Sequence, residues 1–133
     1  MRLFFLLVAL APIVFSESNK CNKKTDSKEC LKGRLEIKGI CSNYVITIIK
    51  GDFDTSKVET SWTDPESDKQ YQNAFKLGSP CTFPSSLNEG DEFYFEFVQE
   101  TKEDCAVCMA YRPVPEKINL ISVINSPCPG LTP

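Results

Sequence analysis

Glu92-Phe93-Tyr94-Phe95-Glu96-Phe97-Val98-Gln99 is the stretch that decides the fold. Phenylalanine occupies every second position at 93, 95 and 97, with glutamate or tyrosine between. A period of two predicts a β-strand with one apolar face toward a core. The turn residues 88–91 before it, Asn-Glu-Gly-Asp, support this boundary.

Other segments show the same short alternation, and helical periodicity is almost absent. We predict further strands over residues 34–40, 44–50, 58–63, 70–76, 105–112 and 118–124. The first two are expected to form a hairpin about residues 41–43, and the last, apolar on both faces, to be central. About seven short strands separated by turns predict an all-β fold: a single antiparallel sandwich or partly open barrel, stapled by disulfides.

The N-terminus predicts export. Residues 1–16 contain Arg2, an apolar run and small residues before a cleavage point, as in a signal peptide. We expect a polar arm over residues 17–30 and one β domain over 31–133. No later apolar run is long enough for a membrane span. The expected localisation is secreted or periplasmic.

Seven cysteines occur after the predicted cleavage point, and export makes disulfides their expected state. Seven is an odd number, so at least one cysteine is free, modified or paired between chains, which admits a disulfide-linked dimer. Sequence alone leaves the pairing open. The disulfide candidates are Cys21, Cys30, Cys41, Cys81, Cys105, Cys108 and Cys128.

Cys105-Ala-Val-Cys108 has the C-x-x-C spacing of thiol-disulfide enzymes. Redox catalysts place this pair at a helix N-terminus, whereas here we predict a strand. Alternation along that strand would put Cys105 and Cys108 on opposite faces, so that each bridges to a different element. A structural role is therefore favoured, and a thiol-disulfide redox protein is the alternative. Zinc binding is disfavoured because a second C-x-x-C is missing.

Composition excludes several chemistries. The chain has no histidine, which removes Ser-His-Asp triads, Cys-His pairs and His-ligated zinc. A formal net charge of −3 offers no basic field for nucleic acid. The carboxylates of residues 64–68 are expected to lie in a solvated turn, because Lys69 and Phe75 replace the glycine and glutamate of a calcium loop. We predict no catalytic residue, no metal and no cofactor.

Aromatic side chains on predicted strands form the candidate binding surface. Tyrosine and tryptophan combine a large apolar body with a polar group, as protein- and glycan-binding faces require. The candidates are Trp62, Tyr71, Tyr94 and Tyr111. The resulting hypothesis is a non-enzymatic binding module for a protein or glycan ligand.

An exported β-rich domain with dispersed cysteines is also loosely similar to netrin-like modules, which include tissue inhibitors of metalloproteinases. The similarity covers the general pattern of the chain. It implies an inhibitor module as a further alternative. Those inhibitors begin with a cysteine whose amine and carbonyl meet the protease zinc, whereas Cys21 lies four residues inside the expected start of this chain.

Overall fold

The computed structural model describes residues 29–131. The predicted signal peptide, residues 17–28 of the predicted arm, and Cys21 lie outside the described residues. The described part is all-β, with three 3-10 turns and no α-helix. It contains no helix long and apolar enough to cross a membrane.

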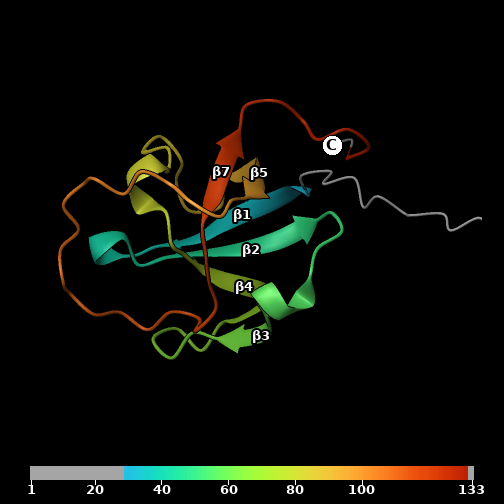
Figure 1. Ribbon diagram of the computed structural model, residues 1–133. Helices are drawn as coiled ribbons and strands as arrows, with labels where there is room; N and C mark the ends of the chain where they lie inside the picture. Colours follow the sequence, from blue (N-terminus) through green and yellow to red (C-terminus); the bar gives the residue numbers. More distant parts are fainter. Residues whose placement is uncertain (1–28, 132–133) are drawn as a thin grey trace, which may run out of the picture.

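Seven strands form one sheet (Figure 1). Four of them follow the predicted strands closely, and the first begins at Cys30, the last residue of the predicted arm. The strands are β1 (Cys30–Lys38), β2 (Tyr44–Lys50), β3 (Glu59–Thr63), β4 (Gln70–Leu77), β5 (Glu92–Phe97), β6 (Ile118–Asn119) and β7 (Ile121–Ile124).

The strand order is β3-β4-β2-β1-β5-β7, and these neighbours are antiparallel. β1 and β2 form the predicted hairpin, with a 3-10 turn over Ile40–Ser42 between them. β6 pairs in parallel with β4, while β7 pairs with β5. The segment after residue 117 therefore pairs with β4 through β6 and with β5 through β7. These two short ladders do not close the sheet.

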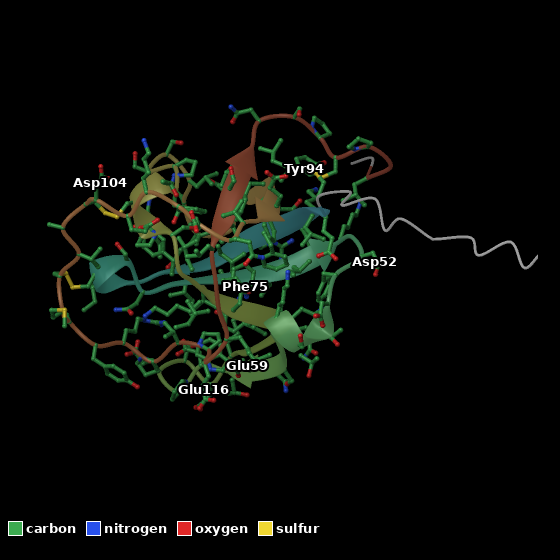
Figure 2. The ribbon with its side chains drawn as sticks, viewed as in Figure 1. Asp52, Glu59, Phe75, Tyr94, Asp104 and Glu116 are labelled. Atoms are coloured by element: carbon green, nitrogen blue, oxygen red, sulfur yellow. A yellow bond between two sulfur atoms is a disulfide. The ribbon has the colours of Figure 1, made fainter. Side chains whose placement is uncertain are left out.

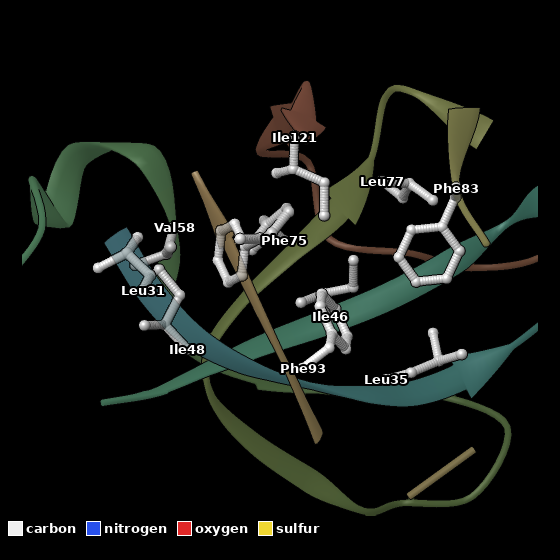
Figure 3. Packing of buried hydrophobic residues seen from close by; sticks show 11 residues of the cluster. Leu31, Leu35, Ile46, Ile48, Val58, Phe75, Leu77, Phe83, Phe93 and Ile121 are labelled. Carbon is white, nitrogen blue, oxygen red and sulfur yellow. The ribbon is translucent and has the colours of Figure 1, made fainter. Parts of the chain in front are cut away.

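The main core confirms the period-two prediction for β5. Phe93 and Phe95 are buried and Phe97 packs against the same cluster, which includes Phe75 of β4 (Figure 3). Ring centroids of Phe75 lie 6.0 Å from Phe95 and 5.8 Å from Phe97. Gly33 of β1 faces this cluster, and an added Cβ would lie 2.8 Å from the Phe95 ring. Glycine is therefore required for the close approach of the strand to that ring.

A smaller apolar cluster packs separately from the main core. Tyr71 and Ala74 belong to it, whereas Phe75 belongs to the main core. Residues 71 and 74 are an odd number apart, so a regular strand would place them on opposite faces. Asn73 between them has φ +52°, a left-handed conformation that shifts the alternation in the manner of a β-bulge.

Two strand predictions are wrong. Residues 105–112 form no strand: segment 98–117 runs round the outside of the sheet, drawn in orange in Figure 1. Residues 118–124 are not a central strand, because they divide into β6 and β7, and β7 ends the strand order. Of their apolar residues, Ile121 is buried and Val123 packs against the main core, whereas Ile118 is exposed.

Three disulfides staple the fold. Cys30–Cys128 joins the start of β1 to the segment after β7, Cys41–Cys108 joins the β1–β2 turn to segment 98–117, and Cys81–Cys105 joins the 3-10 turn Pro80–Thr82 to that segment. They use six of the seven cysteines, and Cys21 is the seventh. Such bridges indicate folding in an oxidising environment.

Candidate binding loop

We name residues 105–112 the tethered loop, because covalent and polar contacts fix it at several points. The first is the Cys81–Cys105 bridge. Around this bridge the Cys81 backbone N–H donates to Glu103 Oε2 at 3.0 Å, and the Cys105 N–H donates to Cys81 Sγ at 3.3 Å. The entry to the loop is therefore held against the 3-10 turn that precedes β5.

The second tether is the Cys41–Cys108 bridge to the β1–β2 turn. Cys41 has φ +52°, so this turn is closed by a left-handed residue. The Ala110 N–H donates to Cys41 Sγ at 3.3 Å, and Asn43 Nδ2 donates to the Ala110 carbonyl at 3.0 Å. The backbone N–H and carbonyl of Ala110 thus bond to a sulfur atom and a side-chain amide, and not to a neighbouring strand. The alternating apolar residues of this segment therefore do not lie in a β-ladder.

The third tether is ionic and ends the loop. Arg112 Nη2 lies 3.2 Å from Asp64 Oδ2, and Arg112 Nε lies 3.1 Å from Glu66 Oε2. Asp64 also accepts hydrogen bonds from Ser67 Oγ and the Glu66 N–H, at 2.7 and 3.2 Å. The expectation of a fully solvated turn over residues 64–68 is therefore wrong for Asp64, which is 1 % exposed.

The ionisation of Asp64 depends on these partners. Burial alone raises the pKa of a carboxyl group. Here the Ser67 hydroxyl, the Glu66 N–H and the Arg112 guanidinium outweigh burial and hold the pKa of Asp64 below its usual value. Asp64 is therefore an anion at neutral pH, paired to the end of the tethered loop.

Between these tethers the loop presents apolar side chains to solvent. Met109 is 97 % exposed, Tyr111 85 % and Val107 44 %, and neighbouring Ile40 in the β1–β2 turn is 62 % exposed. Among the described residues the only other large hydrophobic residue this exposed is Ile118. The strongest concentration of exposed apolar side chains in residues 29–131 thus coincides with the tethered loop.

Two hollows flank Tyr111. One, of about 500 Å³, lies between Tyr111 and Trp62, and the other, of about 320 Å³, lies between Tyr111 and Ile40. Both are shallow and open to solvent, so they suit side chains of a partner better than an enclosed small molecule. Their charged lining residues are Lys38, Glu59, Glu66, Glu89, Arg112, Glu116 and Lys117.

The four aromatic candidates from the sequence do not form one surface. Tyr71 is buried, and Trp62 is half-buried against it, with ring centroids 5.8 Å apart. Tyr94 is half-buried on β5 and lies well apart from Asp104, which precedes the loop (Figure 2). Only Tyr111 of the four is exposed, and only Trp62 shares a hollow with it.

The outer face of β1 and β5 near Tyr94 carries charged side chains that form ion pairs with one another. Glu92 contacts Lys32 at 2.6 Å and Arg34 at 2.7 Å. Hydrogen bonds from these two cations lower the pKa of Glu92 to about 2. Lys32 also lies over the Tyr94 ring, 5.8 Å from its centroid. These internal pairs leave this face a weaker candidate for recognition than the loop.

Cys105 and Cys108 are each bonded to a different element, as their sequence context predicts, although residues 105–112 form no strand. The described residues contain one close group of metal-ligand types, formed by Cys81, Glu103 and Cys105. Two of its three members are joined in a disulfide and so have no thiolate for a metal.

Three exposed apolar residues, Ile40, Val107 and Met109, were not predicted as site residues. On the expected strand, positions 107, 109 and 111 share one apolar face, and such a face is normally buried in a core. A sequence signal against that strand does exist: cysteines at 105 and 108 and prolines at 113 and 115 mark a segment held by crosslinks and poor in ladder hydrogen bonds.

Comparison with family models, with curated proteins and with solved structures gives no match for the chain.

Proposed function

We propose that the chain is an exported, non-enzymatic binding module that recognises a protein through the tethered loop. The observation that carries this proposal is a cluster of exposed apolar side chains, Val107, Met109 and Tyr111, on a backbone held by two disulfides and a buried ion pair. Exposed apolar patches on soluble domains are typical of interaction sites.

The fixed backbone of the tethered loop favours tight binding. A mobile loop loses conformational entropy when a partner binds, and that loss subtracts from the binding free energy. Here the contacts at Cys105, Cys108, Ala110 and Arg112 fix the backbone before binding. Apolar side chains on such a backbone are preorganised for a partner surface.

Side-chain chemistry favours a protein over a glycan. Sugar recognition relies on flat aromatic faces beside hydrogen-bonding groups, and Tyr111 alone supplies an exposed ring here. Tyrosine and methionine are both enriched at protein interfaces. Val107 and Met109 match an apolar pocket on a protein surface.

Charge around Tyr111 indicates the character of that partner. Four glutamates line the two hollows, against three cations. The formal charges of these seven side chains sum to −1, and buried Asp64 adds a further negative charge beside Arg112. The surroundings of Tyr111 are therefore weakly acidic, so we expect a partner with basic residues around an apolar site, since complementary charge speeds association.

Export by the signal peptide and a disulfide-linked dimer belong to the same proposal. Three intrachain bridges support an oxidising compartment. Because they use the six other cysteines, a bridge between chains would fall on Cys21.

The thiol-disulfide enzyme and the netrin-like inhibitor stay alternative predictions. The first would need a Cys105–Cys108 bridge in its oxidised form, and the second a mature chain that begins at Cys21.

Affinity capture from the extracellular fluid of the source organism tests the proposal. We expect immobilised wild-type protein to retain a defined protein that the triple variant Val107→Ser/Met109→Ser/Tyr111→Ser fails to retain. The three changes remove the exposed apolar surface without altering a tether. Ile118→Ser, which changes an exposed apolar residue outside the loop, is the matched control and should retain the same protein.

Thermal melting of all three proteins shows that each is folded. Purified partner should then bind the triple variant at least about tenfold more weakly than wild type, because exposed apolar and aromatic residues dominate interface energetics. Equal retention of the same protein by the folded triple variant would contradict the proposal.

A further inference from the structure

Met109 is chemically distinctive as well as exposed. The chain contains two methionines, and the other is Met1, within the predicted signal peptide. Met109 is 97 % exposed as a whole residue, so its thioether is open to solution. Susceptibility of sulfur to oxidation follows this exposure.

The exposure is fixed by structure. Cys108 is bonded to Cys41 on one side of Met109, and Ala110 on the other side is held by Asn43 Nδ2 and Cys41 Sγ. Both neighbouring residues are thus anchored, and the backbone cannot fold Met109 inward without breaking these contacts. All six cysteines among residues 29–131 are disulfide-bonded. Met109 therefore has the one readily oxidised sulfur in the described part of the chain.

We propose that Met109 is an oxidation site that switches off recognition by the tethered loop; the switch rests on the proposed function, whereas the modification itself does not. The oxidant is a peroxide. A sulfur lone pair attacks the terminal peroxide oxygen, and the O–O bond breaks as the S–O bond forms. The proton on the transferred oxygen passes to the leaving oxygen, which departs as water when hydrogen peroxide is used. The sulfur is oxidised by two electrons to the sulfoxide, and the peroxide is reduced.

The product changes the loop at its most exposed point. A sulfoxide is polar and accepts hydrogen bonds, whereas the thioether is apolar. Met109 lies between Val107 and Tyr111 in the sequence, so the polar group enters the middle of the apolar surface. A partner pocket that excludes water would have to bury the new oxygen without a matched donor, which opposes binding.

The first test uses hydrogen peroxide on the disulfide-bonded protein, followed by peptide mapping by mass spectrometry. We expect one added oxygen on Met109, at a rate within about threefold of free methionine because the sulfur is fully open. The Cys21→Ser variant removes thiol oxidation from the assay, and Met109→Leu should gain no oxygen on this segment. A rate more than tenfold below that of free methionine, or no oxygen on Met109, would overturn the oxidation site.

The second test measures the consequence. Hydrophobic-interaction chromatography should elute the oxidised protein earlier than the untreated one, and peroxide should leave the elution of Met109→Leu unchanged. The partner obtained by capture should bind the oxidised protein at least about tenfold more weakly than the untreated one. For Met109→Leu, the affinity measured after peroxide should equal the affinity that the same variant has before peroxide. Undiminished partner binding by the oxidised protein would overturn the switch while leaving the proposed function intact. Failure of the loop to bind any partner, with Met109 oxidised at the expected rate, would overturn the proposed function and the switch but not the oxidation site.

Discussion

Removing the Cys30–Cys128 bridge is expected to lower the free energy of unfolding by about 4 kcal/mol. The two cysteines are 98 residues apart, so their bridge closes nearly the whole described chain into one loop. Constraint of the unfolded chain grows with the length of the closed loop and reaches roughly 4–5 kcal/mol for about 100 residues. Cys128 is also 4 % exposed, so the bridge contributes to packing beside the start of β1.

Urea unfolding of Cys30→Ala/Cys128→Ala against wild type measures this effect. The matched control is Cys81→Ala/Cys105→Ala, which removes a bridge of 24-residue separation and should cost about 3 kcal/mol. A larger loss in the control than in the Cys30–Cys128 variant would contradict the assignment of the long bridge as the main covalent constraint on the core.

Arg112→Ala is expected to cost about 3 kcal/mol, because it leaves the Asp64 carboxylate buried without its cation. Ser67 and the Glu66 N–H stay as partners of Asp64, but the charge loses its counter-ion at 3.2 Å. The matched control is Arg34→Ala, since Arg34 also pairs with a carboxylate, Glu92, at 2.7 Å on an exposed face. An exposed pair contributes less than about 1 kcal/mol, so the control should change stability little.

The Asp64 pair also sets a pH dependence. The pKa of Asp64 is lowered in the folded protein, so its contribution to stability is complete above the unfolded value near 3.8 and is lost as pH falls through the folded value. Removal of Arg112 raises the pKa of Asp64 toward that unfolded value. We therefore expect the stability difference between wild type and Arg112→Ala, measured by urea unfolding, to shrink below pH 4. A difference that stays constant or widens with acid would contradict the role of the ion pair.

Alternation of side chains predicts the sheet well because it is a local property. Phe93, Phe95 and Phe97 point to one core, and β2 has the predicted bounds of residues 44–50. The hairpin between β1 and β2 follows from two adjacent strands and a short connection. Each of these features depends on neighbours in the sequence, and so the all-β class is readable from it.

Features that depend on contacts between distant residues cannot be predicted from the alternation of side chains. The left-handed residue Asn73 reverses the faces of β4, which places Tyr71 away from Phe75 although both occupy odd positions. A one-residue bulge leaves only a weak signal in the sequence. Tyr71 is thereby buried and Trp62 partly covered, so two of the four predicted surface aromatics contribute little exposed area.

The tethered loop shows the same limit in another way. Val107, Met109 and Tyr111 alternate as on a strand with a buried face, yet each is exposed. Alternation has this meaning only where a neighbouring strand and a core are present. Here the positions of Cys41, Cys81 and Asp64 hold the segment outside the sheet, and those pairings are set by the three-dimensional structure.

The most direct test of the tethered loop as the binding surface is the dissociation constant of the captured, purified partner for Tyr111→Ala. Tyr111 is 85 % exposed and flanked by both hollows, so its truncation removes contact area without disturbing the core. We predict a loss of about 2 kcal/mol in binding free energy, roughly 30-fold in Kd, with an unchanged melting temperature. Tyr94→Ala, which changes a half-buried tyrosine of β5 outside the tethered loop, should bind with the wild-type Kd. An unchanged Kd for Tyr111→Ala, with weakened binding by Tyr94→Ala, would contradict the loop as the recognition surface.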